Sequence, residues 1–236
     1  MKYYFLWVTL FLILTAFTPS KTFSQISQAI FEYSEKAYGT DNFLVNGWKY
    51  LPEHYNAEGN PYFSNLSWTE GILHSGEESF ENIDMLYNTL MDELIIKTNL
   101  ENGLPAFVML NREFVKSFSI NQHLFINTST IPGTDLEGYI ELVYDSNTLK
   151  FLSKHKKSFV AEYSGSNPWG RISGQSSTHY IYAYGTLTKI PNKKALLNYF
   201  EAHKKQVRAF MKSKGIKFKK AKSPELKTLM EYCVSL

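Results

Sequence analysis

Cysteine is nearly absent from this sequence, which contains Cys233 and no other. A single cysteine excludes an intramolecular disulfide, and it excludes the paired-cysteine motifs that hold structural zinc. The fold must therefore be held together by packing. Cys233 belongs to an apolar pattern of helical spacing near the C-terminus, so we expect a buried structural thiol and not a nucleophile.

Short catalytic motifs are absent as well. The sequence contains no G-x-S-x-G turn, no H-E-x-x-H helix and no glycine-rich phosphate loop. Its histidines stand too far apart for any two to share a helical turn or an alternating strand face. They are His54, His74, His123, His155, His179 and His203. We therefore predict no catalytic residue, no metal site and no cofactor, and the pattern favours a non-enzymatic protein.

One short stretch does combine a histidine with carboxylates, in the order His74, Glu77 and Glu78. A histidine and two carboxylates near a turn could bind a cation or exchange protons with a substrate. A polar hairpin loop explains the same residues, and this is the interpretation that we favour.

A long apolar run occurs once, from Tyr3 to Phe17, and Lys2 precedes it. A positive start, an apolar run of about 15 residues and small residues after it are typical of a secretory signal peptide, whereas a membrane-spanning helix needs roughly 20. We predict a signal peptide over residues 1–24 and a single β-rich domain over residues 25–236. The protein is thus expected to be exported to the periplasm, the outer membrane or the cell surface.

Between about residue 66 and residue 190, short apolar runs alternate with turn residues. Asn102-Gly103 stands between two such runs and is a strong hairpin signal, because both turn residues accept positive φ. Ser146-Asn147 separates a second pair of runs. About nine to eleven short strands with turns between neighbours predict an antiparallel meander, arranged as a sandwich or a partly open barrel.

The hydrophobic period changes after Asn192, which is a good helix N-cap. Apolar positions recur at helical spacing from Leu196 to Met211. Ser223 is the expected N-cap of a second helix, in which residues 226–233 carry one apolar stripe. The sequence therefore predicts that segment 192–235 packs two α-helices on the sheet, and that the fold is α+β and predominantly antiparallel β.

Charge is distributed unevenly along the chain. Residues 25–188 contain 10 basic and 19 acidic residues, whereas residues 189–222 contain 12 basic residues and 1 acidic residue. This basic segment could lie against the acidic β-part, or it could face an anionic partner. For the second interpretation we predict binding residues on the polar side of the first helix. They are Lys204, Lys205, Arg208 and Lys212.

Aromatic residues gather between residues 48 and 68. Exposed aromatic rings stack on sugars or line apolar pockets, but the same residues could close one end of the β core. The candidate binding residues of this group are Trp48, Tyr50, Tyr55, Tyr62 and Trp68.

Several stretches together resemble a group of exported β-rich proteins of Bacteroidota. They are NGWKYLPEHYNAEGNPYF, ENIDMLYNTLMDELII, VKSFSI, HLFIN, EGYIELVYD, KKALLNYF and LKTLMEYC. The resemblance spans most of the chain after the predicted signal peptide. It implies an envelope or secreted location in a Gram-negative cell, and it implies no activity and no catalytic residues.

These features favour an exported, non-enzymatic envelope protein that acts as an accessory or binding module of an outer-membrane or periplasmic assembly. The expected partners are a protein of that assembly, or an anionic lipid or polysaccharide surface, and not nucleic acid. An alternative is a periplasmic carrier that holds an apolar or lipid ligand inside the β-fold. A third hypothesis is a hydrolase that acts on envelope sugars.

Overall fold

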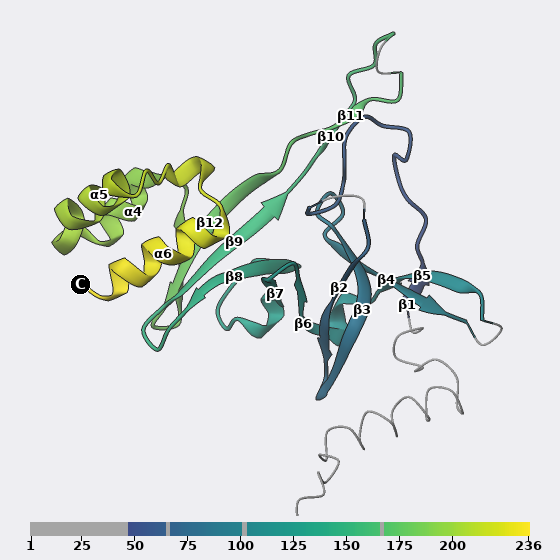
Figure 1. Cartoon of the computed structure of the whole chain (residues 1–236), viewed down its shortest axis with the longest axis horizontal. Helices are drawn as coiled ribbons and strands as arrows, with labels where there is room; N and C mark the ends of the chain where they lie inside the picture. The colour runs from purple at the N-terminus through teal and green to yellow at the C-terminus, as the bar shows by residue number, and fades with distance from the viewer. Residues whose placement is uncertain (1–46, 65–66, 101–102, 166–167) are drawn as a thin grey trace, which may run out of the picture. The chain divides into compact units, whose positions relative to one another are not determined.

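The computed structural model of the chain describes residues 47–64, 67–100, 103–165 and 168–236. In this part of the chain, eleven strands form one antiparallel sheet, shown in Figure 1 together with the helices that follow it. The predicted signal peptide lies outside the described residues. None of the helices in the described ranges is both long enough and apolar enough to cross a bilayer.

The strands are short, and most pair with a neighbour in the chain. They are β1 (Gly47–Lys49), β2 (Thr69–Ser75), β3 (Glu78–Asn88), β4 (Glu93–Asn99), β5 (Pro105–Leu110), β6 (Val115–Ile120), β7 (His123–Asn127), β8 (Tyr139–Asp145), β9 (Lys150–Lys156), β12 (Ser176–Ala183) and β13 (Thr186–Ile190). Their order in the sheet is β1-β5-β4-β3-β2-β6-β7-β8-β9-β12-β13, and β10 (Phe159–Val160) pairs separately with β11 (Arg171–Ile172). No pairing within the described residues joins β1 to β13, so the sheet is open.

Turn chemistry explains the hairpins. In the β4–β5 hairpin Asn99 lies opposite Pro105, and Gly103 has a φ of +76°, a conformation that glycine adopts without strain. In the β8–β9 hairpin the hydroxyl of Ser146 accepts a hydrogen bond of 3.2 Å from the Leu149 amide. Both hairpins were predicted from these turn residues and are confirmed.

The C-terminal segment folds into α4 (Lys193–Tyr199), α5 (Lys204–Ser213) and α6 (Ser223–Val234), with 3₁₀ turns η3 (Glu201–His203) and η4 (Phe218–Lys220) between them. The α+β fold with helices packed on an antiparallel sheet is thus confirmed. The prediction of one continuous helix after Asn192 is wrong, because the backbone leaves helical geometry at Phe200. In a straight helix, Leu196 and Val207 would lie about 16 Å apart along the axis. The break lets both residues enter one apolar cluster.

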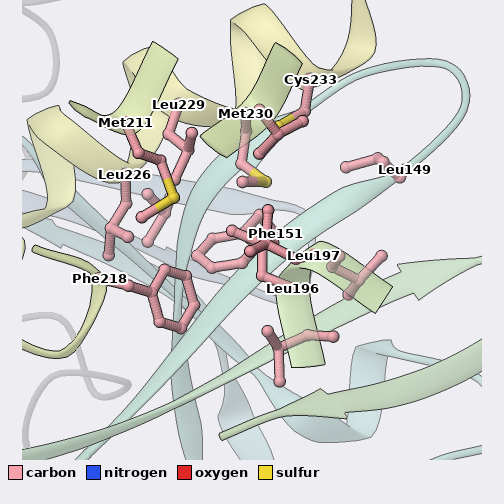
Figure 2. Close-up of a cluster of buried hydrophobic side chains, with 14 of the residues drawn as sticks. Leu149, Phe151, Leu196, Leu197, Met211, Phe218, Leu226, Leu229, Met230 and Cys233 are labelled. Atoms are coloured by element: carbon pink, nitrogen blue, oxygen red, sulfur yellow. The ribbon is translucent and has the colours of Figure 1, made fainter. Parts of the chain in front are cut away.

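This cluster, the helix–sheet core, packs the helices against β8, β9, β12 and β13. Figure 2 shows side chains from the helices converging on the ring of Phe151, a fully buried residue of β9. Cys233 is among them, and burial raises the pKa of its thiol to about 12, as expected for a structural cysteine. The buried members are Val143, Leu149, Phe151, Ile181, Ala183, Ile190, Leu196, Leu197, Val207, Met211, Ile216, Phe218, Leu226, Leu229, Met230 and Cys233.

A second cluster, the strand core, covers the half of the sheet built from β2 to β8 and is rich in aromatic rings. Phe118 and Phe125 stack at a centroid distance of 5.0 Å, and the ring of Tyr139 meets Phe118 edge-on at 5.0 Å. Along β9, residues two apart share a face. Phe151 of the helix–sheet core is therefore followed on the same face by Ser153 and His155, which places polar groups beside the apolar ones.

Truncation of Leu229 should show how strongly the helices are held. This side chain is fully buried, so Leu229→Ala should lower the free energy of unfolding by about 2–5 kcal/mol. Leu51→Ala is the matched control, because Leu51 is 69% exposed and its loss should change the value by less than about 0.5 kcal/mol. Urea unfolding measures both variants. Equal effects would mean that the helices contribute no cooperative packing.

Candidate functional site

The predicted aromatic residues divide into a packed set and an exposed set. Tyr62 is 8% exposed and packs against β3 and β4, and its hydroxyl lies 2.9 Å from that of Tyr50. The indole of Trp68 stacks on Phe107 at 5.2 Å. Tyr50, Tyr62 and Trp68 belong to a small apolar cluster with Leu86 and Ile95 of β3 and β4, and their predicted binding role stays a prediction.

Trp48 and Tyr55 are the exposed set, at 70% and 79% of their maximal accessible surface. Trp48 lies on β1, which forms one edge of the sheet, and Tyr55 lies in the turn-rich segment that follows. The structure therefore leaves two of the five aromatic candidates free to contact a ligand.

The four predicted basic residues all lie on α5, whose buried residues are Val207 and Met211. Lys204, Arg208 and Lys212 are spaced four residues apart, so they form one line along the helix, and Lys205 lies beside it. Lys205, Arg208 and Lys212 are exposed, and Lys204 is half-buried. We call these four residues the basic face.

The basic face is not neutralised by the protein itself. Among the described residues, none of the 12 basic side chains of segment 189–222 forms an ion pair with a carboxylate. The ion pairs that do form join residues of the β-part. This arrangement favours the interpretation that the segment faces an anionic partner over the interpretation that it attracts the acidic β-part.

The positions of these lysines also oppose helix stability. The first turn of α4 holds Lys193 and Lys194, and the first turn of α5 holds Lys204 and Lys205, with no acidic residue in either turn. A positive charge at a helix N-terminus is unfavourable, as are like charges four residues apart, each by a few tenths of a kcal/mol. The sequence thus retains charges that the fold itself does not favour.

Two tyrosines lie close to the basic face. Tyr184, in the β12–β13 turn, is 93% exposed, and Tyr199 at the end of α4 is 37% exposed. Burial raises the pKa of Tyr199, and the phenol of Tyr184 raises it further. Lys204 of the basic face donates a 3.2 Å hydrogen bond to the side chain of Asn198, next to Tyr199.

Beneath the helices, Glu141 on β8 is the centre of a buried polar network. Its side chain is 2% exposed, and its two oxygens lie 2.5 Å from His123 Nδ1 and 2.6 Å from His155 Nε2. Burial alone would raise the pKa of Glu141, but hydrogen bonds from His123, His155 and Ser223, with the charge on His155, lower it to about 2. The carboxylate therefore stays ionised at neutral pH.

Ser223 was predicted to cap α6, and this prediction is wrong. It is the first residue of the helix, and its hydroxyl helps to lower the pKa of Glu141. The backbone N–H of Lys222 instead donates a 2.8 Å hydrogen bond to the side chain of Glu225. The side chain that bonds the cap residue is therefore that of Glu225 and not that of Ser223.

The network continues from His155 to the sheet surface. His155 Nδ1 lies 2.8 Å from the hydroxyl of Ser177 and 3.2 Å from the amide nitrogen of Gln175. Ser177, His155 and Glu141 are connected in the order that serine hydrolases use. Ser177 and the Gln175 amide therefore share one ring nitrogen of His155. The arrangement is better suited to holding a charge than to activating a nucleophile.

His179 extends the polar row towards the helices. Its Nδ1 lies 2.8 Å from the hydroxyl of Ser153, and its ring packs between Phe151 and Phe218. Burial, followed by the positive charge on His155, lowers the pKa of His179 to about 4. His179 is therefore neutral at pH 7. In the described ranges, no set of three or more histidine, cysteine or acidic residues is placed to hold a metal ion.

Asp92 is a second polar centre, in the turn between β3 and β4. Its side chain accepts hydrogen bonds of 2.7 Å from the Tyr87 hydroxyl and from Lys154 Nζ. Lys154 also donates to the backbone carbonyls of Glu137 and Tyr139, at 2.8 and 2.9 Å. This ion pair therefore ties the β3–β4 turn to β8 and β9.

A pocket of about 190 Å³ lies beside Asp92. It is formed by the edge strand β1, the start of β4, the end of β5 with the residues after it, and the start of β8. Of the predicted binding residues, Trp48 lines it. The lining residues are Trp48, Asp92, Glu93, Met109, Leu110, Asn111, Arg112 and Tyr139.

The sequence identified the exposed charges and missed the buried polar groups. His123 and Glu141 lie on separate strands from His155, and the strand order brings them together. One signal was present, because His155 and Ser153 occupy the inward positions of β9 after Phe151. The cluster of His74, Glu77 and Glu78 is a β2–β3 hairpin turn, in which Glu77 pairs with a surface lysine.

Comparison with known proteins transfers no function to this chain: no family model, curated protein or solved structure matches it.

The buried histidine should make stability depend on pH. The pKa of His179 is about 6.5 in the unfolded chain and about 4 in the folded protein. As pH falls through this window the unfolded chain gains a proton that the folded protein does not. The free energy of unfolding should therefore drop by up to about 3 kcal/mol from this residue.

The measurement is urea unfolding at several pH values between 7 and 4, for the wild type and for His179→Asn, whose amide can still bond Ser153. Other groups titrate in both proteins, so the difference between the two pH profiles isolates His179. The variant should lose less stability on acidification. Parallel profiles would show that His179 is already protonated in the folded protein, or is exposed to solvent.

Proposed function

We propose that this protein is an exported envelope module that attaches to an anionic lipid surface through the basic face of α5, as an accessory of an outer-membrane or periplasmic assembly. One observation carries the proposal. The described part of the chain offers no carboxylate partner to the 12 basic residues of segment 189–222, although most of the charge elsewhere is acidic.

The magnitude of the attraction is sufficient for peripheral binding. A lysine or arginine near an anionic membrane surface contributes about 1 kcal/mol, so the basic face supplies about 4 kcal/mol before its neighbours are included. The attraction falls within a Debye length, about 10 Å at 0.1 M salt. Binding of this kind is reversible and sensitive to ionic strength.

One further feature favours lipid over other polyanions. Tyr184 and Tyr199 present amphipathic rings beside the basic face, and tyrosine is enriched at the headgroup level of membranes. The apolar side of α5, with Val207 and Met211, is buried in the helix–sheet core. The helix therefore has no apolar stripe to insert, and attachment rests on charge and on the tyrosine rings.

The carrier alternative receives less support from the described interior. The pocket beside Trp48 is lined by several charged side chains, and its volume of about 190 Å³ is below the range of about 300–1,000 Å³ typical of sites for drug-sized ligands. The helix–sheet core fills the space between α4–α6 and the sheet with buried side chains. An acyl chain would have to displace them.

Charge reversal of the basic face tests the proposal. The variant carries Lys204→Glu, Lys205→Glu, Arg208→Glu and Lys212→Glu. Its affinity for phosphatidylcholine vesicles that contain phosphatidylglycerol, measured by co-sedimentation, should be at least about 100-fold lower than that of the wild type, because each removed charge contributes about 1 kcal/mol. The wild type should bind at about 0.05 M salt, release at about 0.5 M, and ignore pure phosphatidylcholine. Acidic residues in the first turn of α5 favour the helix, so misfolding is not expected.

The control reverses four lysines of the β-part, Lys49, Lys97, Lys116 and Lys150, and so changes the net charge equally. Surface ion pairs contribute little to stability, so this variant should fold and still bind the vesicles. An equal loss of affinity in both variants would mean that binding depends on the net charge of the protein and not on the basic face. If the wild type does not bind vesicles but copurifies stoichiometrically with an acidic protein, that protein and not a lipid surface is the partner of the basic face.

A further inference from the structure

The pocket beside Trp48 has no role in the surface attachment proposed above. Its residues come from four separate places in the chain, at β1, the β3–β4 turn, the end of β5 and the start of β8. The basic face lies on α5, which contributes no residue to the pocket. An inference about this pocket therefore stands independently of the proposed function.

Two residues that line this pocket each carry a buried polar atom with no hydrogen-bond partner among the described residues. Tyr139 is 1% exposed, and its hydroxyl has none; the same holds for Nε of Arg112, whose guanidinium lies 5.9 Å from the Tyr139 ring centroid. Buried polar groups are nearly always paired in folded proteins. Two unpaired groups on residues that line one pocket indicate that a ligand or its hydroxyl groups complete the hydrogen bonding there.

The charges of the pocket are balanced, which argues for a neutral ligand. Asp92 is neutralised by Lys154 at 2.7 Å, and Arg112 Nη2 donates a 2.9 Å hydrogen bond to the backbone carbonyl of Asp92. Glu93 is half-buried, and burial followed by the nearby charge of Glu53 raises its pKa. An anion would meet Asp92 and Glu93, and a cation would meet Arg112.

The unpaired groups also call for a ligand that both donates and accepts hydrogen bonds. Arg112 Nε–H only donates, a carboxylate at Glu93 only accepts, and the Tyr139 hydroxyl does both. Sugar hydroxyls donate and accept, and adjacent ones can engage two such groups together. The indole of Trp48, 70% exposed at the pocket rim, offers a flat apolar face to the C–H side of a sugar ring.

We infer that this pocket binds one neutral sugar ring, with Trp48 stacked on the ring and with Glu93, Arg112 and Tyr139 as partners of its hydroxyl groups. The volume of about 190 Å³ admits a single ring, and the pocket opens beside an edge strand, so the ring can be the terminal unit of a longer glycan. Because one ring buries little surface, its dissociation constant should be about millimolar.

The experiment uses saturation-transfer-difference NMR on the full chain with D-glucose, D-galactose, D-mannose and N-acetyl-D-glucosamine, each at about 10 mM, tenfold above the expected constant. At least one sugar should receive saturation, and titration should give its affinity. Trp48→Ala should weaken that affinity at least tenfold. Trp169→Ala is the matched control, because Trp169 is likewise exposed, at 60%, and does not line the pocket.

Tyr139→Phe separates a binding role from a structural one. Removal of an unpaired buried hydroxyl should raise the urea midpoint of the free protein, because the group lacks a partner in that state. The same variant should bind the sugar several-fold more weakly. A raised midpoint with unchanged sugar affinity would remove Tyr139 from the site.

Two results would overturn the inference as a whole. One is the absence of saturation transfer to all four sugars with the folded wild type. The other is an equal loss of affinity in Trp48→Ala and Trp169→Ala, which would place the sugar elsewhere. Failure of vesicle binding in the earlier experiment would leave this result untouched, so the two proposals can fail separately.

Discussion

The buried carboxylate of Glu141 is the interaction on which the arrangement of helices and sheet depends. It accepts hydrogen bonds from His123 on β7 and His155 on β9, and the hydroxyl of Ser223 at the start of α6 helps to lower its pKa. An ionised group at this depth is stable because each oxygen has a donor. The network thereby joins β7 and β9 to β8, the strand on which α6 packs.

Much of the fold followed from local rules. The hairpins at Gly103 and Ser146 were predictable because turn residues of these types favour hairpin conformations. The apolar stripe that ends at Cys233 was predictable because apolar residues at helical spacing indicate the buried side of a helix. The break at Phe200 was not. It arises from tertiary competition, since both halves of the predicted helix gain more by entering one core than by continuing straight.

The candidate sites were predictable to different degrees. Exposed charges on α5 could be read from the sequence, because position on a helix face depends on spacing alone. The partners of Glu141 could not, because their contacts depend on strand order. Asp92 shows the same limit, because its carboxylate binds Tyr87 and the distant Lys154. Buried polar pairs are specified by topology, which local patterns do not contain.

The open sheet has two edges, and both are poor templates for a foreign strand. The described part of β1 covers three residues and starts where the description of the chain begins, and β13 consists of five residues that run between the Tyr184 turn and α4. Short edges present few free backbone N–H and C=O groups, and Lys49 and Lys189 place charge on them. A protein of this design can expose an open sheet at high local concentration without extending it from molecule to molecule into a fibre.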